Sequence, residues 1–216
     1  MNDLKPKYHD TLAIGSVFLA IYAIWAILVS SSSSFIHSFD QAIIKLVYNH
    51  NSGQIALAKI VTKVGNTSTI VILTIIIVII LIVFRKYAYA LFVAGTMAAS
   101  NGYNWIIKHA VQRTRPSAKH LVYADGFSFP SGHSVGSAAL FGVLIVLTIL
   151  LVKSKGWRTC LIVIWALFPL VIGYTRIYLH VHFPSDVFGG WIEGITFVLL
   201  GYSVLYHLYL NRQNKG

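Results

Sequence analysis

Long apolar stretches dominate the chain, and short polar segments separate them. Six of these stretches approach or exceed the roughly 20 residues that an α-helix needs to cross the hydrocarbon core of a bilayer. The second stretch is rich in β-branched residues, which in water would favour a strand. Within lipid, however, every backbone N–H and C=O group must pair inside its own segment, so a helix is predicted there too. The predicted spans are residues 11–30, 68–84, 87–108, 132–152, 157–178 and 186–209.

The segment between the first two spans, residues 31–67, has a different pattern. Apolar residues recur there at near-helical spacing in two runs, 35–47 and 55–64, and the second run alternates with Lys59 and Lys63. A helix with one apolar and one basic face lies in the plane of the membrane surface. The pattern therefore predicts two amphipathic surface helices between the first and second spans.

The composition supports the membrane reading. Of the 216 residues, 56% are hydrophobic and only 11% are charged, whereas a soluble globular domain carries about 25% charged residues. We see no internal repeat. We therefore expect an all-α fold, an integral membrane bundle of six transmembrane helices, in which residues 1–216 form a single domain.

The net charge of +11 would suggest nucleic acid as a partner for a soluble protein. Here the basic residues form neither a patch nor a tail. They fall between the apolar segments, where positive charges set membrane topology. Nucleic-acid binding is therefore not predicted.

The N-terminal region could be taken for a signal peptide. Lys5 and Lys7 precede the apolar run, and the small residues Ser30–Ser34 follow it. The run is about 19 residues long, which exceeds a typical signal-peptide core and is enough to span a bilayer. We interpret it as a retained first helix.

Cys160 is the only cysteine, and it lies inside an apolar run. A single thiol excludes both a disulfide framework and a cysteine-rich zinc site. We expect it to be a small core residue.

The distribution of Lys and Arg residues predicts how the helices are oriented in the membrane. With the N-terminus inside, nine Lys and Arg residues are internal and eight are external, so the counts alone do not decide. The internal charges, however, crowd into short tails and turns, and this distribution favours both termini in the cytoplasm. The internal set is Lys5, Lys7, Arg85, Lys86, Lys153, Lys155, Arg158, Arg212 and Lys215; the external set is Lys45, Lys59, Lys63, Lys108, Arg113, Arg115, Lys119 and Arg176.

This topology brings three polar clusters to one membrane face. The third predicted helix ends there at Lys108, and the fourth begins there near His133. The fifth ends at the same face at Arg176, and the sixth begins there at Asp186. Cations beside lipid are costly, and a chain that keeps them there has a use for them.

The chemistry of these clusters fits phosphoryl transfer, which spreads negative charge over three oxygens and needs fixed cations, an in-line nucleophile and an acid for the leaving oxygen. Lys108, Arg115 and Arg176 are candidate phosphate ligands, and arginine suits bidentate contact with phosphate. We interpret the other two cations of this face, Arg113 and Lys119, as charges that extend to the membrane interface.

The segment Pro130–His133 lies where a helix begins. Ser131 or Ser134 can cap that helix, and Gly132 permits close approach of the backbone to a ligand. Amide groups exposed at a helix N-terminus attract phosphate. Taken alone, the segment is equally compatible with an ordinary capped helix start that carries a solvated histidine.

His182 and Asp186 are four residues apart, with Pro184 in the expected first helical turn. A carboxylate at that distance can hold one ring nitrogen of His182 as N–H and leave the other as a nucleophile. His180 should point elsewhere, as an interfacial histidine. We expect Glu193, two turns into the sixth helix, to hydrogen-bond within the bundle.

These residues resemble the three signature motifs of the type 2 phosphatidic acid phosphatase family, integral-membrane lipid phosphate phosphatases related to vanadium haloperoxidases. The resemblance extends from about residue 54 to about residue 210. All ten fixed positions agree, in the family's order. They are Lys108-x6-Arg115-Pro116, Pro130-Ser131-Gly132-His133 and Arg176-x5-His182-x3-Asp186.

The resemblance implies a role for each residue. His182 would attack phosphorus and form a phosphohistidine, and Asp186 would orient it. His133 would protonate the leaving oxygen and then help to activate water. Lys108, Arg115 and Arg176, with the backbone at Ser131 and Gly132, would hold the phosphoryl oxygens. No metal and no cofactor would be required.

The implied function is hydrolysis of a phosphate monoester or diphosphate on a membrane lipid such as phosphatidylglycerol phosphate, undecaprenyl diphosphate or phosphatidic acid. The enzyme would lie in a bacterial cell membrane, with its site on the non-cytoplasmic side, the bilayer and the lipid as partners, and no obligate protein partner. Two alternatives are a vanadate-dependent oxidase and a non-catalytic lipid-binding or transport protein of the same fold.

Overall fold

The computed structural model describes residues 8–48 and 52–211, and every regular element among them is helical. The helices, in chain order, are α1 (Tyr8–Ser30), α2 (Ser34–Val47), α3 (Ser52–Val61), the 3₁₀-helix η1 (Thr62–Gly65), α4 (Thr67–Val83), α5 (Tyr87–Val111), α6 (Gly132–Leu151), α7 (Lys155–Tyr178), α8 (Pro184–Leu205) and the π-helix η2 (Tyr206–Leu210). The all-α prediction is confirmed.

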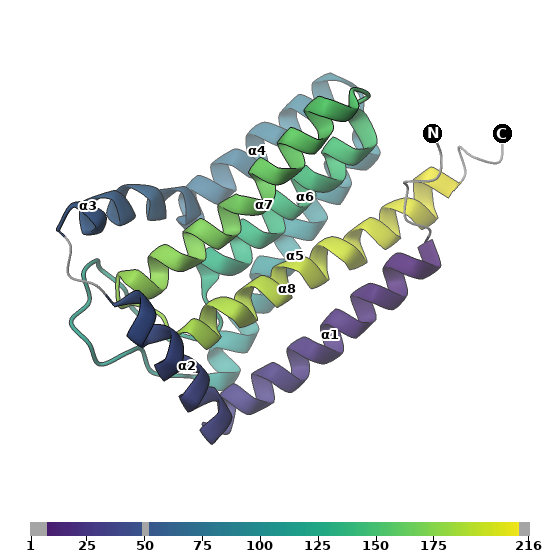
Figure 1. Cartoon of the computed structure of the whole chain (residues 1–216). Helices are drawn as coiled ribbons and strands as arrows, with labels where there is room; N and C mark the ends of the chain where they lie inside the picture. Colours follow the sequence, from purple (N-terminus) through teal and green to yellow (C-terminus); the bar gives the residue numbers. More distant parts are fainter. Residues whose placement is uncertain (1–7, 49–51, 212–216) are drawn as a thin grey trace.

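The long helices form a bundle with two distinct ends (Figure 1). α1 runs antiparallel to α8, and α1 begins at the same end of the bundle where η2 finishes. The other end carries α2, α3 and the irregular segment 112–131 that joins α5 to α6. The polar clusters of the sequence therefore lie at the end that α2 and α3 cover.

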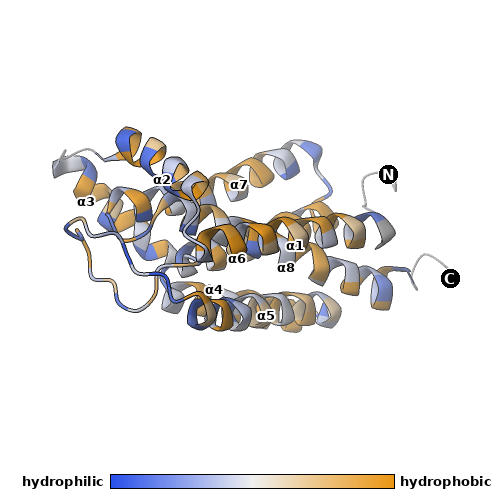
Figure 2. Ribbon diagram, turned by 90° about the horizontal axis from the view of Figure 1, so that it is seen from below, coloured by the Kyte–Doolittle hydropathy of each residue, from blue (hydrophilic) through white to orange (hydrophobic). Residues whose placement is uncertain are grey.

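Hydrophobic residues extend along the helices of the bundle (Figure 2), and many of them are exposed on its outside. Ile24 and Ile27 on α1 are 61% and 64% exposed, and Val83 on α4 is 71% exposed. An outer surface of this kind is stable in lipid rather than in water. The protein is a multi-pass membrane protein.

Length and hydropathy confirm fewer spanning helices than the six that the sequence predicts. Four helices are long and apolar enough to cross a membrane: α1, α6, α7, and α8 continued by η2. A fifth span results if α4, which has only 17 residues, is joined to the α3–η1 segment from which it is bent by 46°. α5 is long enough to cross a membrane, but it is not apolar enough. Its C-terminal half carries Asn101, Asn104 and Lys108.

The two helices predicted between the first and second spans are present as α2 and α3, but their arrangement is not that of two helices lying free on a surface. α2 packs against the N-terminal part of α8 and buries Ile36 and Asp40. α3 packs against α7 and buries Ala58. Ile36, Asp40 and Ala58 attach the two helices to the bundle, and the amphipathic pattern does not single out these residues as buried.

α6 and α8 cross at very short distance. A Cβ atom on Gly190 would lie 2.9 Å from the carbonyl oxygen of Ser131, and one on Gly194 would lie 2.8 Å from that of Val135. Only glycine therefore fits at these two positions. Their close approach sets the start of α6 directly beside the start of α8, where the Ser131 amide donates to the Asp186 carbonyl oxygen at 3.1 Å.

Two further predictions can be compared with the fold. Cys160 is exposed on the outer face of α7, so the expectation of a core thiol is wrong. The hydrophobicity of its neighbours reflects lipid contact rather than burial in protein.

The terminal charges on which the predicted topology rests lie outside the described residues, and the assignment of 1–216 to one domain stays a prediction. Those charges are Lys5, Lys7, Arg212 and Lys215.

Candidate active site

His182 and Asp186 face each other across the turn that starts α8. His182 Nδ1 lies 3.4 Å from Asp186 Oδ2, an ion-pair distance that is longer than a well-formed hydrogen bond. The same Oδ2 accepts a hydrogen bond from the Phe183 amide at 2.9 Å, which fixes the carboxylate against the first turn of the helix. Pro184 occupies that first turn, as the sequence predicts. Both reactive side chains are buried.

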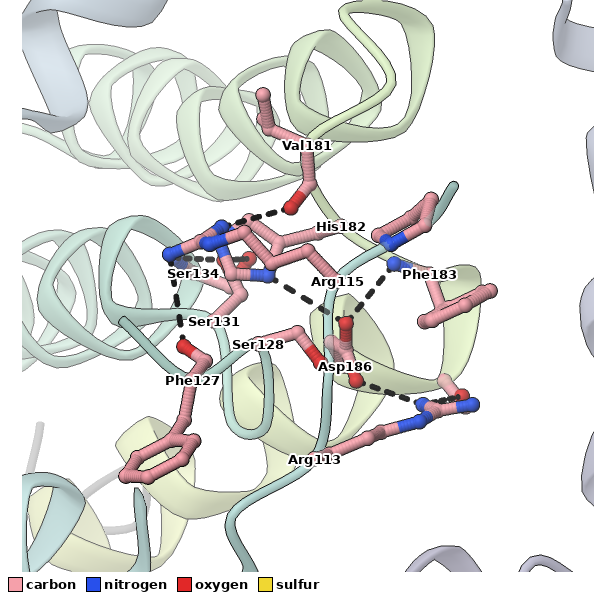
Figure 3. A network of polar contacts seen from close by, with 12 residues as sticks. Arg113, Arg115, Phe127, Ser128, Ser131, Ser134, Val181, His182, Phe183 and Asp186 are labelled. Carbon is pink, nitrogen blue, oxygen red and sulfur yellow. Dashed lines mark hydrogen bonds and ion pairs between the residues drawn. The ribbon is translucent and has the colours of Figure 1, made fainter. Parts of the chain in front are cut away.

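Arg115 lies on the opposite side of the His182 ring (Figure 3). Its Nη1 is 3.2 Å from His182 Nε2 and donates to the Val181 carbonyl oxygen at 2.7 Å. Its Nη2 donates to the Asp125 carbonyl oxygen at 2.6 Å. Arg115 therefore holds the 112–131 segment against the turn that carries His182.

These partners assign the two ring nitrogens of His182. A carboxylate beside Nδ1 favours N–H there and leaves the lone pair on Nε2. Burial lowers the pKa of His182 well below its usual value, and the charges of Arg176, Arg115 and Lys108 act in the same direction. The imidazole is therefore neutral at neutral pH, and its Nε2 lone pair faces Arg115 Nη1.

His133 lies one residue into α6. Its Nε2 is 2.9 Å from Asn66 Oδ1, so the partner assigns N–H to that nitrogen. Asn66 comes from the junction between η1 and α4 and belongs to none of the three polar clusters. An amide at such a junction carries no local signal of function. Only the fold places it on the histidine.

Lys108 and Arg176 complete the group of cations. Lys108 Nζ donates to the Phe127 carbonyl oxygen at 2.9 Å, and Arg176 Nη1 donates to Thr62 Oγ1 at 2.9 Å. Both side chains are held by neutral oxygen acceptors rather than by carboxylates. Arg176 Nε is buried and has no hydrogen-bond partner among the described residues. An N–H donor left unpaired in this way can bind an anion.

Ser131 and Gly132 begin α6 as predicted. Ser131 is the N-cap, and its hydroxyl accepts from the Ser134 amide at 3.4 Å. The Ser131 amide already donates to the Asp186 carbonyl oxygen, so a contact between that amide and phosphate would require an exchange of partners. The Ser131 amide therefore links the N-terminus of α6 to the N-terminus of α8.

Comparison with known proteins shows the family of the chain. A model of the PAP2 superfamily matches residues 89–210, which include all three clusters. The chain belongs to the PAP2 superfamily. This confirms the family that the signature residues resemble.

Named relatives of this PAP2 chain are phosphatases. It is 30% identical over 144 residues to phosphatidylglycerophosphatase B of Bacillus subtilis (strain 168), covering 65% of this chain and 70% of that protein. It is 28% identical over 123 residues to dolichyldiphosphatase 1 of Mus musculus, covering 52% of this chain and 51% of that protein.

A solved structure shares the fold of this PAP2 chain. It is the crystal structure of the transmembrane PAP2 type phosphatidylglycerolphosphate phosphatase from Bacillus subtilis. The two structures agree with a TM-score of 0.81 at 24% identity over 90% of this chain and 96% of that one.

Arg113 is placed differently from the prediction. We expected it to extend to the membrane interface, but it donates to Asp186 Oδ1 at 2.7 Å and to Asp40 Oδ2 at 2.8 Å. Its guanidinium also stacks over the Phe183 ring, 4.2 Å from the centroid. The prediction is wrong because Asp40, more than seventy residues earlier in the chain, supplies a second buried carboxylate.

Two other polar residues lie outside the reacting group. His180 points away from the site, as predicted, but it is buried rather than interfacial: its Nδ1 is 3.1 Å from the Lys119 carbonyl oxygen and its ring stacks on Tyr48. Glu193 hydrogen-bonds within the bundle as predicted, where it accepts from the Tyr22 hydroxyl at 2.7 Å.

Proposed function

We propose that this protein hydrolyses a phosphate monoester or diphosphate on a membrane lipid, without a metal ion, through a phosphohistidine. The observation that carries the proposal is the position of the His182 ring, with Asp186 at Nδ1 and Arg115 at Nε2. A neutral imidazole that is oriented by a carboxylate and surrounded by cations suits attack on an anionic phosphoryl group.

In the first step, Arg115 Nη1 releases His182 Nε2, Nε2 forms a bond to phosphorus, and the bond between phosphorus and the lipid oxygen breaks. Asp186 stabilises the positive charge that develops on the imidazole. His133 gives a proton to the departing oxygen, which leaves as the lipid alcohol or, from a diphosphate, as the lipid monophosphate. His133 gives this proton from its imidazolium form and becomes a neutral imidazole, so Nε2–H can stay on Asn66 Oδ1 while Nδ1 supplies the proton.

In the second step, water attacks phosphorus and the bond to His182 Nε2 breaks. His133 takes a proton from the water, and inorganic phosphate leaves. Lys108, Arg115 and Arg176 neutralise the phosphoryl oxygens in both steps, the part that metal ions have in other phosphoryl-transfer enzymes. The neutral partners of Lys108 and Arg176 support this role, because neither cation has an ion pair with a carboxylate among the residues that the structure describes.

The substrate class follows from the location of the site at the end of the bundle that α2 and α3 cover (Figure 1). There a phosphate can reach His182 while its hydrocarbon tail stays in the bilayer, and α2 and α3 can flank a lateral entrance. We favour phosphatidylglycerol phosphate or undecaprenyl diphosphate, with phosphatidic acid as the third candidate. The relatives named for a glycerolipid phosphate and for a polyprenyl diphosphate support both of the first two.

We expect the purified protein to release phosphate from at least one of these three lipids in mixed micelles, in buffer that contains EDTA. Burial of the tail supplies binding energy that a soluble phosphate lacks. The kcat/KM for the lipid should therefore exceed that for glycerol 3-phosphate by about 100-fold or more. Comparable values for the two would contradict the membrane substrate, and activity that requires added magnesium would contradict the metal-independent mechanism.

We also propose a topology: α1, α4, α5, α6, α7 and α8 each cross a bacterial cell membrane, with both termini in the cytoplasm and the site on the other side. α5 crosses despite its polar residues because Asn104 is buried within the bundle and Lys108 is held by the Phe127 carbonyl oxygen. The short turns rich in Lys and Arg, α4–α5 and α6–α7, support this orientation.

A labelling experiment tests the topology. In a Cys160→Ser background, Ser117→Cys places a thiol in the exposed part of the 112–131 segment, and Ser154→Cys places one at the start of α7. A membrane-impermeant maleimide should label the first variant in intact cells and the second only after permeabilisation. The reverse pattern would invert the proposed orientation.

A further inference from the structure

Asp40 is a buried carboxylate that none of the signature clusters contains. It lies on α2, is 2% exposed, and makes three hydrogen bonds with two residues of the candidate site. Asp40 Oδ1 accepts from the Ser185 amide at 2.8 Å, and Oδ2 accepts from the Ser185 hydroxyl at 2.9 Å and from Arg113 Nη2 at 2.8 Å. Three donors therefore hold this buried carboxylate in one position.

The first of these contacts caps α8 from outside the helix. The first N–H groups of an α-helix have no partner within the helix, and a carboxylate there is also stabilised by the helix dipole. In α8 the Asp186 side chain satisfies the Phe183 amide, and Asp40 satisfies the Ser185 amide. Trp25 of α1 fixes the same residue through the Ser185 carbonyl oxygen at 3.0 Å. The turn that carries Asp186 is thus held by α1 and α2 as well as by its own helix.

The contact with Arg113 has an electrostatic consequence. One guanidinium lies between two buried carboxylates, with Nη1 on Asp186 and Nη2 on Asp40 (Figure 3 shows the Asp186 side). If Asp186 were its only partner, Arg113 would neutralise most of the negative charge that Asp186 presents to His182. Because Asp40 shares the guanidinium, the Arg113–Asp40–Asp186 group keeps a net negative charge beside the histidine.

We propose that Asp40 is a positioning residue for the reaction: through Arg113 and Ser185 it holds Asp186 in place and preserves the negative charge that Asp186 presents to His182. Asp40 touches neither His182 nor the phosphoryl group. Asp40 should act in the step in which the imidazole becomes positively charged. Its substitution should therefore lower kcat more than it weakens substrate binding. α2 is then a part of the catalytic apparatus in addition to a flank of the lipid entrance.

The test is the Asp40→Asn variant, assayed with the panel lipid that the wild-type protein hydrolyses and with orthovanadate as a probe of the phosphate site. Asparagine keeps an oxygen for the Ser185 amide but removes the charge that faces Arg113. Removal of a partner that orients a functional side chain typically costs about 10–100-fold in activity. We expect a loss of that size in kcat, with KM and the vanadate inhibition constant within about threefold of wild type.

Asp10→Asn is the matched control, because it removes the same charge from an exposed position on α1, and it should leave all three constants unchanged. A kcat for Asp40→Asn within threefold of wild type would overturn the proposal. So would a change confined to KM or to vanadate inhibition, since Asp40 would then act on binding.

A second background tests whether Asp40 acts through Arg113. The loss in the Asp40→Asn, Arg113→Gln double variant should not exceed that of the more damaging single variant, whereas independent effects would multiply. If Asp40→Asn does not fold, Arg113→Lys tests the same arrangement, because one ammonium cannot reproduce the two-sided contact of a guanidinium. A selective loss of kcat supports the proposal, and wild-type kcat overturns it.

The inference rests on the proposed phosphatase, and the assay separates the two. A wild-type protein that releases phosphate from none of the lipids counts against the function. An active wild-type protein with an equally active Asp40→Asn variant counts only against Asp40.

Discussion

His182→Ala is expected to lose at least about 10⁴-fold in kcat, equivalent to about 5.4 kcal/mol of transition-state stabilisation. The substitution removes the atom that would bond to phosphorus, and neither His133 nor His180 is placed to replace it. His133 is held on Asn66, and His180 points toward Lys119. Phosphate binding should survive, because Lys108, Arg115 and Arg176 keep partners other than His182.

The measurement is phosphate release together with trapping of the covalent intermediate. Rapid denaturation during turnover of radiolabelled lipid should leave acid-labile phosphate on the wild-type protein and none on His182→Ala. His37→Ala is the matched control, since it makes the same change at an exposed position on α2. A phosphoprotein of equal yield in His182→Ala would show that another residue is the nucleophile.

Asp186→Asn is expected to cost about 10³-fold or more in kcat with a small change in KM. The carboxylate receives donors on both oxygens, from Arg113 at Oδ1 and from the Phe183 amide at Oδ2. An amide offers one acceptor oxygen and must turn its NH₂ group toward one of these donors or toward His182. An NH₂ group that faces Nδ1 moves the lone pair of the ring to Nδ1 and places N–H where phosphorus should be attacked.

Steady-state kinetics on the preferred lipid measures this effect. The control is Asp10→Asn, which makes the same change at an exposed position on α1. Activity of Asp186→Asn within tenfold of wild type would mean that orientation of His182 does not depend on the carboxylate, and the proposed division of roles would be wrong.

The sequence determined much of this picture because its signals are local and strong. Apolar runs of about 20 residues have one stable conformation in lipid, and the helices begin and end within a few residues of the predicted spans. The three motifs identified the family, and alternation of helix direction was enough to bring their residues to one face. The His182–Asp186 pairing needed only a spacing of four residues and a proline in the first helical turn.

Where the sequence failed, the deciding partner was distant along the chain. Arg113 looked like an interfacial cation because nothing near it in sequence is acidic, and Asp40 looked like one polar residue in an amphipathic pattern. Asn66 lies outside the three motifs. Cys160 was assigned to a core because an apolar segment in a membrane protein can face lipid or protein with the same composition. Hydropathy does not confirm the span predicted at α5, because Asn101, Asn104 and Lys108 make that helix more polar.

The sequence by itself determined the helical membrane fold, the family and the identity of the candidate reactive groups, because these depend on segment hydrophobicity and short fixed spacings. The tertiary structure alone decided which atoms face each other. It placed Arg115 at Nε2 of His182, Asn66 on His133, and Arg113 between Asp40 and Asp186. Those pairings depend on how α2, α4 and α8 pack, and packing is set by the whole bundle rather than by any one segment.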